Sequence, residues 1–157
     1  MASATKASAA HREGRYRARV FVGGSYHQEV RSRLQDIKAA VIKAGFVPIV
    51  ADEVQLERTE DIHHETMALL HTCRLAIFEL SQPSGAFMEI ERVPDYGTQA
   101  LILFNTPKAS DYTGSRMLST FVEEHKASVE MRSYLQAETA KQIVAEWLER
   151  QRKEGFG

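Results

Sequence analysis

The stretch 75–89, LAIFELSQPSGAFME, constrains the fold of this chain more than any other. It opens with a continuous apolar run, which is typical of a buried strand, and a Ser-Gln-Pro-Ser-Gly segment then ends the strand. A helix is expected to begin close to Glu89. In open α/β sheets, ligands bind beyond the carboxyl ends of the strands. We therefore expect Glu89 to face a site above the end of this strand.

The rest of the chain alternates between patterns typical of strands and of helices. Strands are expected at 18–22, 46–50, 74–80, 99–104 and 128–134. Helices are expected at 26–44, from Thr59 toward Cys73, near Glu89, at 115–125 and around 140–148. Pro48 predicts either an edge position for the second strand or a position at the end of a strand, because proline cannot donate to the ladder. Gly45 is expected to end the first helix in the left-handed conformation.

This alternation predicts an α/β fold of the flavodoxin-like type. The domain is expected to span 18–152, with a five-stranded, mostly parallel sheet and helices on both faces. Residues 1–17 are small, polar and basic, and are expected to form a flexible tail. Right-handed crossovers would place the loops after the first four strands at one edge of the sheet.

Composition excludes several classes of partner. The 157 residues carry 20 Lys and Arg against 21 Asp and Glu, and this balance argues against binding to nucleic acid or to an anionic membrane surface. We find no apolar run long enough to span a membrane.

Cys73 is the single cysteine, so no disulfide can form within the chain, and a cytoplasmic location is expected. Cys73 itself lies on an apolar stripe and is expected to be buried.

Two loops of the predicted edge are suited to anions. Gly24 and Ser25 belong to a Gly-Gly-Ser turn that opens onto a helix, and Ser84 and Gly85 belong to a second such turn. Either turn could equally serve only to reverse the chain. Glu89 likewise has a structural alternative, because an acid in the first turn of a helix is favourable on its own.

Other polar residues are expected to be structural. Glu79 ends a buried strand, and either an ion pair with Arg74 or Arg92, or simple exposure, is expected there rather than catalysis. The adjacent histidines His63 and His64 point about 100° apart on a helix, so no metal site is predicted.

In order and spacing, these segments resemble the nucleoside 2-deoxyribosyltransferase superfamily. The branch that they resemble most is the 2′-deoxynucleoside 5′-phosphate N-hydrolases. The matching stretches are 20–25, 49–53, 62–70, 75–89 and 100–104, followed by Ser-Arg-Met-Leu-Ser at 115–119.

The resemblance implies a reaction and a set of roles. It implies that Glu89 is the nucleophile, which attacks the anomeric carbon of a nucleoside or its 5′-monophosphate and forms a covalent intermediate. It implies that Ser25, Ser84 and Ser119 hold the phosphate, with Ser119 coming from the neighbouring subunit of a homodimer. It implies no cofactor and no metal. The further substrate contacts that we carry over are Gly24, Tyr26, His27, Asp52, Thr66 and Gly85.

Four positions depart from the family pattern. An Arg of the first-loop phosphate motif is replaced by His27. The second carboxylate of the family, an Asp, corresponds to Thr66, and the adjacent Glu65 is our candidate to replace it. A small glycine near the nucleophile has become Glu91, and Pro94 is expected to kink or end the helix. These departures leave two alternatives open: a nucleotide-binding or sensing module without catalysis, and an NAD hydrolase similar to TIR domains.

Overall fold

The computed structural model describes residues 18–24, 28–50, 53, 62–80, 87–105 and 116–155, with the backbone alone at 28–30, 62–65, 87–88 and 116–117. The predicted tail lies outside the described residues. In chain order the elements are β1 (Arg19–Gly24), α2 (Gln28–Lys43), β2 (Val47–Val50), α3 (Ile62–His71), β3 (Leu75–Glu79), α4 (Phe87–Arg92), β4 (Gln99–Phe104), α5 (Arg116–Glu124), β5 (Val129–Ser133) and α6 (Ala137–Lys153).

The strands form one sheet in the order β2-β1-β3-β4-β5, and every adjacent pair is parallel. This arrangement confirms the flavodoxin-like α/β fold. β2, which contains Pro48, lies at one edge as predicted, and β5 lies at the other. The central strand β3 is buried along its whole length, as its continuous apolar run predicted.

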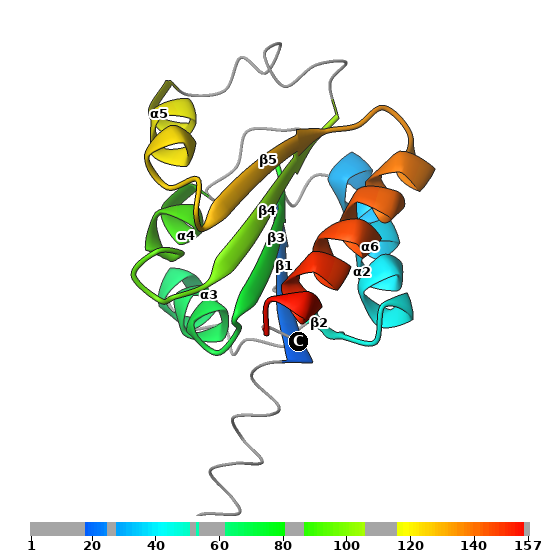
Figure 1. The fold of residues 1–157 in the computed structure, drawn as a ribbon, viewed down its shortest axis with the longest axis horizontal. Helices are drawn as coiled ribbons and strands as arrows, with labels where there is room; N and C mark the ends of the chain where they lie inside the picture. Colours follow the sequence, from blue (N-terminus) through cyan, green and yellow to red (C-terminus); the bar gives the residue numbers. More distant parts are fainter. Residues whose placement is uncertain are drawn as a thin grey trace, which may run out of the picture.

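Two hydrophobic cores sandwich the sheet, because alternate side chains of each strand point to opposite faces. Leu75 and Ile77 of β3 belong to the core that α2 and α6 cover. Ala76 and Phe78 belong to the core on the other face, which α3, α4 and α5 cover. Figure 1 shows α2 and α6 side by side on one face and the other three helices on the opposite face. Helices therefore cover both faces, as expected.

The carboxyl end of α2 is capped by a local backbone motif and by a side chain from α6. Gly45 has a φ of 88°, and the amide of Phe46 donates to the carbonyl of Val41 over 3.1 Å, which is the Schellman arrangement. The predicted role of Gly45 is confirmed. Arg152 of α6 donates to the carbonyl of Ala44, and its guanidinium lies 5.0 Å from the ring centre of Phe46. The last turn of α6 thus holds the end of α2.

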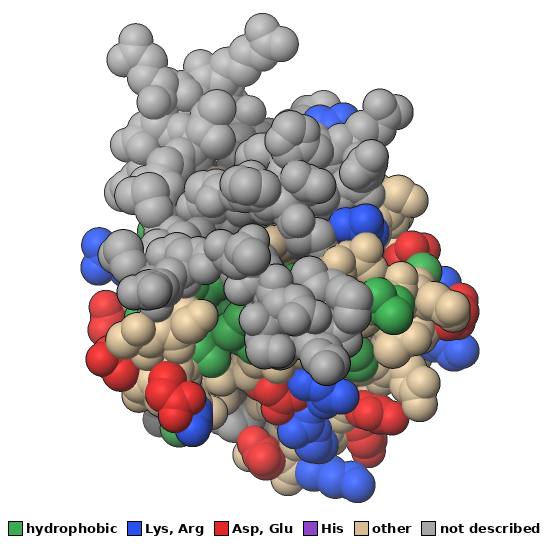
Figure 2. Space-filling view, turned by 90° about the horizontal axis from the view of Figure 1, so that it is seen from above, with side chains coloured by type: hydrophobic (Ala, Val, Ile, Leu, Met, Phe, Trp, Pro, Cys, Tyr) green, Lys and Arg blue, Asp and Glu red, His purple; other side chains and the backbone are tan. Residues whose placement is uncertain are grey.

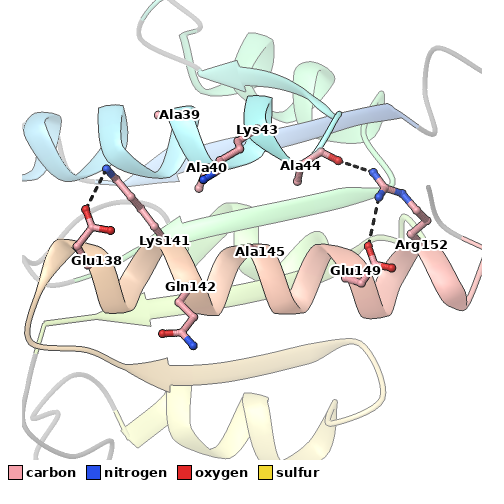
Figure 3. Close-up of a pocket in the computed structure, with 10 residues that line it drawn as sticks. All are labelled: Ala39, Ala40, Lys43, Ala44, Glu138, Lys141, Gln142, Ala145, Glu149 and Arg152. Atoms are coloured by element: carbon pink, nitrogen blue, oxygen red, sulfur yellow. Dashed lines mark hydrogen bonds and ion pairs between the residues drawn. The ribbon is translucent and has the colours of Figure 1, made fainter.

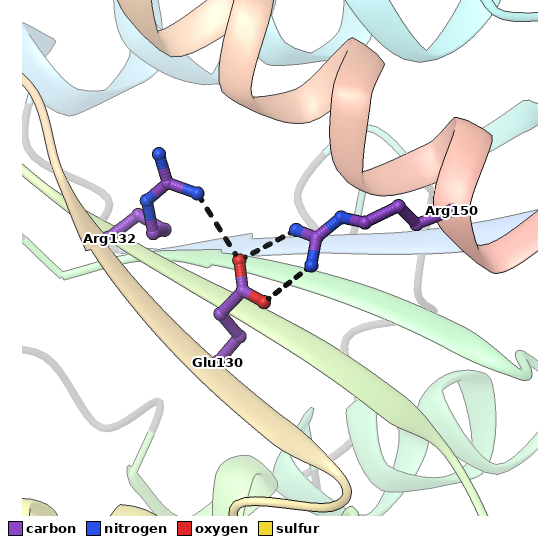
Figure 4. A network of polar contacts seen from close by, with 3 residues as sticks. All are labelled: Glu130, Arg132 and Arg150. Atoms are coloured by element: carbon purple, nitrogen blue, oxygen red, sulfur yellow. Dashed lines mark hydrogen bonds and ion pairs between the residues drawn. The ribbon is translucent and has the colours of Figure 1, made fainter.

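A second contact fixes α6 over the edge strand β5 (Figure 4). Arg150 donates to both carboxylate oxygens of Glu130, over 3.1 and 2.9 Å, and Arg132 lies 3.5 Å from the same carboxylate. Such a bidentate pair adds geometric specificity to its modest energy. Charged side chains on the edge strand also discourage pairing with a foreign strand.

Cys73 follows α3 and is 2% exposed, as predicted. Burial raises the pKa of its thiol to about 11.

In the part of the chain that the structure describes, no helix is both long enough and apolar enough to cross a membrane.

Candidate functional site

Parallel pairing brings the carboxyl ends of the strands to one edge of the sheet, at the top of Figure 1. In the strand register, Gly24 at the end of β1 lies opposite Glu79 at the end of β3. Glu79 in turn lies opposite Leu103 of β4. Glu89 follows on α4. The candidate site is built on this carboxyl edge.

Gly24 is a strand residue, and our prediction that Gly23 and Gly24 form a turn was wrong. A Cβ atom at Gly24 would lie 2.7 Å from the carbonyl oxygen of Glu79, and one at Gly23 would lie 2.8 Å from the ring of Phe21. Gly24 therefore allows the close approach of β1 to β3, and Gly23 leaves room for the rings of Phe21 and Phe78. Turn propensity misled the sequence analysis, because a glycine that is needed for packing has the same signature as one in a turn.

Glu79 is fully buried, and our alternative of simple exposure was wrong. The hydroxyl of Tyr134, which follows β5, donates a hydrogen bond to the Glu79 carboxylate. Burial of a carboxylate is costly unless hydrogen bonds compensate it, so this contact stabilises the strand end. The sequence signal for it was an acid at the end of a strand that is otherwise apolar, but the partner lies 55 residues away.

Asn105, directly after β4, extends this polar layer. Its side-chain amide donates to the carbonyls of Tyr134 and Leu135, over 3.0 and 3.1 Å. Arg33 of α2 donates to the Asn105 side-chain oxygen over 3.4 Å. Four elements or their ends are thus linked at the carboxyl edge. The sequence analysis did not single out Arg33, Asn105 or Tyr134, because only the tertiary fold brings them together with Glu79.

The segment after β2 is attached to α2. The amide of Glu53 donates to the carbonyl of Val50 over 3.1 Å. Its carboxylate accepts from Gln35 and from Lys38, each over 2.6 Å, and the hydrogen bond from Lys38 holds the pKa of this carboxyl below its usual range. Glu53 therefore fixes where the chain leaves β2, next to the predicted site residue Asp52.

Glu89 lies in the first turn of α4, as predicted. The residue is half-buried, and its Oε2 atom is buried. Ile90 is fully buried in the core beneath α4, so the next residue anchors the helix. α4 ends at Arg92, two residues before Pro94, which confirms that this proline limits the helix. The structure thus places the predicted nucleophile in the first turn of a short helix that Ile90 anchors in the core.

The helix beside α4 is α3, which carries Thr66. At this position the family resemblance implies a second carboxylate. Thr66 of α3 is 4% exposed and shares the buried stripe with Leu70 and Cys73. α3 contacts α4 directly. Glu65 lies one residue earlier on α3, about 100° around the helix from Thr66. Its side chain is outside the described part of the structure, so the pairing of Glu65 with Glu89 stays a prediction.

The remaining predicted residues fall into two groups. Ser119 lies on α5 and is exposed. The others lie outside the described residues: Ser25, Tyr26, His27, Asp52, Ser84 and Gly85. The structure therefore places Gly24 at the end of β1 and Glu89 in the first turn of α4, and it does not test the phosphate contacts.

Figure 2 views the molecule from the carboxyl edge. The Lys and Arg side chains coloured in that view are interspersed with Asp and Glu side chains. Within the described ranges, no group of three or more His, Cys, Asp or Glu side chains is placed to hold a metal ion.

The fold is similar to that of several solved structures. CMP N-glycosidase BcmB from Clostridium botulinum superposes with a TM-score of 0.62 at 16% identity, over 82% of this chain and 98% of that one. A structure of the RPS4 and RRS1 TIR domain heterodimer gives 0.50 at 16% identity, over 86% and 96%. A designed Rossmann 2x3 protein gives 0.50 at 19% identity, over 89% and 93%.

At these identities the likeness shows the fold alone: a parallel five-stranded α/β sheet of the Rossmann and flavodoxin type. No protein-family model matches the chain, and no curated protein sequence matches it either.

Proposed function

We propose that this chain cleaves or transfers the N-glycosidic bond of a nucleoside or its 5′-monophosphate, with Glu89 as the nucleophile. One observation carries the proposal. Glu89 stands in the first turn of α4, just beyond the end of the central strand, half-buried and with one carboxylate oxygen inside the protein. Similarity to a structure of a CMP N-glycosidase supports the same choice.

The proposed reaction has two steps. A Glu89 oxygen attacks C1′ of the sugar, and the bond from C1′ to the base nitrogen breaks with its electron pair on the base. A general acid supplies the proton that the leaving base requires. Water, or a second base in a transfer reaction, then attacks C1′, and the bond from C1′ to Glu89 breaks with its electron pair on the carboxylate. The proton lost by the attacking water or base passes to the deprotonated general acid and restores it. Retaining glycosidases follow the same covalent logic, with two carboxyl groups about 5 Å apart.

Glu65 is our candidate for the general acid. Thr66 occupies a buried position on α3 beside α4, and a threonine hydroxyl is too weak an acid to replace a carboxyl group. Glu65 has the required chemistry one residue away. Loss of turnover in Glu65→Gln, with substrate binding retained, would support this role, and full activity would contradict it.

The test of the nucleophile is Glu89→Gln, with Glu91→Gln as its matched control. Glu91 is an exposed glutamate on the same helix, two residues further on. We expect free base from wild type and from the control, and a loss of at least about 10³-fold in Glu89→Gln, because a covalent nucleophile has no substitute. Chromatography of the released base measures the rate.

The substrate panel should include nucleosides, 5′-monophosphates in ribo and deoxy forms, and NAD. Release of cytosine, another base or nicotinamide identifies the bond that is cleaved. If wild type releases no base from any member at high enzyme concentration, the proposal fails. A thermal shift with a nucleotide but without turnover would instead establish a binding module.

A further inference from the structure

A carboxyl group ends the central strand inside the protein. Leu75 and Ile77 belong to the core that α2 and α6 cover, and alternation along β3 places the side chain of Glu79 on the same face. Glu79 is 0% exposed. An apolar side chain would continue this pattern, whereas a buried carboxylate costs free energy even when it is hydrogen-bonded. Packing alone therefore does not explain a glutamate at this position.

The cations that α6 contributes to the groove between α2 and α6 are bound at the helix surface (Figure 3). Lys141 lies 3.5 Å from Glu138, and Arg152 lies 3.2 Å from Glu149, each three residues away on the same helix. Both cations thus serve the outer surface. The Glu79 carboxyl group depends instead on groups at the carboxyl edge of the sheet.

The hydroxyl that Glu79 accepts from reaches it across a whole strand. Tyr134 follows β5, Glu79 ends β3, and β4 lies between them. The Tyr134 side chain is 5% exposed and packs in the core under α2 and α6. Its amide donates to the carbonyl of Phe104, the last residue of β4, over 3.0 Å. Tyr134 therefore links the ends of β3, β4 and β5.

The end of β1 rests on the same residue. Gly24 lies opposite Glu79 in the strand register, and a Cβ atom at Gly24 would lie 2.7 Å from the Glu79 carbonyl oxygen and 3.5 Å from its Cβ atom. On the other side, the amide of Leu80 donates to the carbonyl of Leu103 over 2.9 Å. Glu79 is thus the point at which the carboxyl ends of four strands meet.

We propose that Glu79 and Tyr134 are positioning residues of the candidate site, whose contact holds the carboxyl ends of β1 and β3 in the arrangement that turnover requires. The chain leaves β3 at this point toward α4, which carries Glu89. Both side chains are buried, so they act through the strand ends rather than by contact with the substrate. Their effect on turnover rests on the proposed function. Proteins keep such polar groups in a core at a cost in stability when activity needs them.

The first test measures turnover in Tyr134→Phe, which keeps the ring and removes the hydroxyl. We expect kcat to fall about 10–100-fold with little change in KM, because the variant misplaces Glu89 without removing a contact to the substrate. The matched control, Tyr96→Phe, removes the hydroxyl of a half-buried tyrosine between α4 and β4 and should keep the wild-type kcat. Wild-type kcat in Tyr134→Phe would overturn the proposal.

The second test separates positioning from stability. The double variant Glu79→Met with Tyr134→Phe replaces both polar partners with apolar groups of similar size, which is ordinarily neutral or stabilising. We expect its midpoint of urea unfolding to equal or exceed that of wild type, while its kcat stays as low as that of Tyr134→Phe. A double variant that is less stable than Tyr134→Phe, or that recovers full turnover, would show that the contact is only structural.

The third test needs no turnover. Hydrogen exchange of the amides at residues 80 and 134 reports on the strand ends, since both amides donate between strands there. In the double variant we expect these amides to exchange about tenfold faster or more, while the amide of Ile77 in the middle of β3 exchanges as in wild type. Unchanged exchange at both ends would overturn the positioning role. If wild type releases no base, the proposed function fails, and this measurement still decides whether the pair holds the strand ends.

Discussion

At the scale of single residues, the buried contact between Tyr134 and Glu79 yields a first prediction. Tyr134→Phe removes one hydroxyl and leaves a carboxylate that is 0% exposed with one donor fewer. We expect a loss of about 1–3 kcal/mol in the free energy of unfolding, because a buried acceptor that loses its donor bears the cost of desolvation. Urea unfolding measures it. A control, Tyr96→Phe, alters a half-buried tyrosine elsewhere and should change stability by less.

The Cys73 thiol yields a prediction of pH dependence. Burial raises its pKa from 9.0 to about 11, so the folded state disfavours the thiolate relative to the unfolded state. The resulting stability is fully present below pH 9 and is lost as the pH rises through 11, by roughly 2–3 kcal/mol. The advantage of wild type over Cys73→Ala in urea unfolding should therefore shrink between pH 8 and pH 11. An advantage that stays constant would contradict a raised pKa.

At the scale of elements, the pairing of β1 with β3 depends on Gly24. Replacing a strand glycine with alanine ordinarily stabilises a protein by about 0.4–1 kcal/mol when the new side chain fits. At Gly24 the new Cβ atom would lie 2.7 Å from a backbone oxygen of β3, so we expect Gly24→Ala to lower the free energy of unfolding by about 1–3 kcal/mol. Chemical denaturation checks the sign. A stabilised variant would show that the two strands can separate at this point.

The elements also show how much of the fold the sequence could predict. The apolar run of β3, the proline of β2 and the glycine after α2 each act locally, and the predictions that rest on them are confirmed. Gly23 and Gly24 were placed in a turn because propensity carries no information about the strand that approaches them. The Glu79 contact was missed because its partner is determined by the sheet order rather than by neighbouring residues.

The candidate site was predictable to the same extent. Glu89 could be placed at the carboxyl edge because a strand, a break and a helix follow one another within a few residues. Its environment could not be foreseen, since the burial of its Oε2 atom depends on how α4 packs in the tertiary fold. Local patterns thus locate a candidate residue, while tertiary packing decides what surrounds it.

At the scale of the whole molecule, the contact between Arg152 and Ala44 bears on when the tertiary fold can form during synthesis. The two residues are 108 positions apart in the chain. On the ribosome, β1 and α2 emerge long before the arginine that covers the last carbonyl of that helix. The capping of α2 therefore stays incomplete until the last turn of α6 has been synthesised. The contact between α2 and α6 can therefore form only late in synthesis.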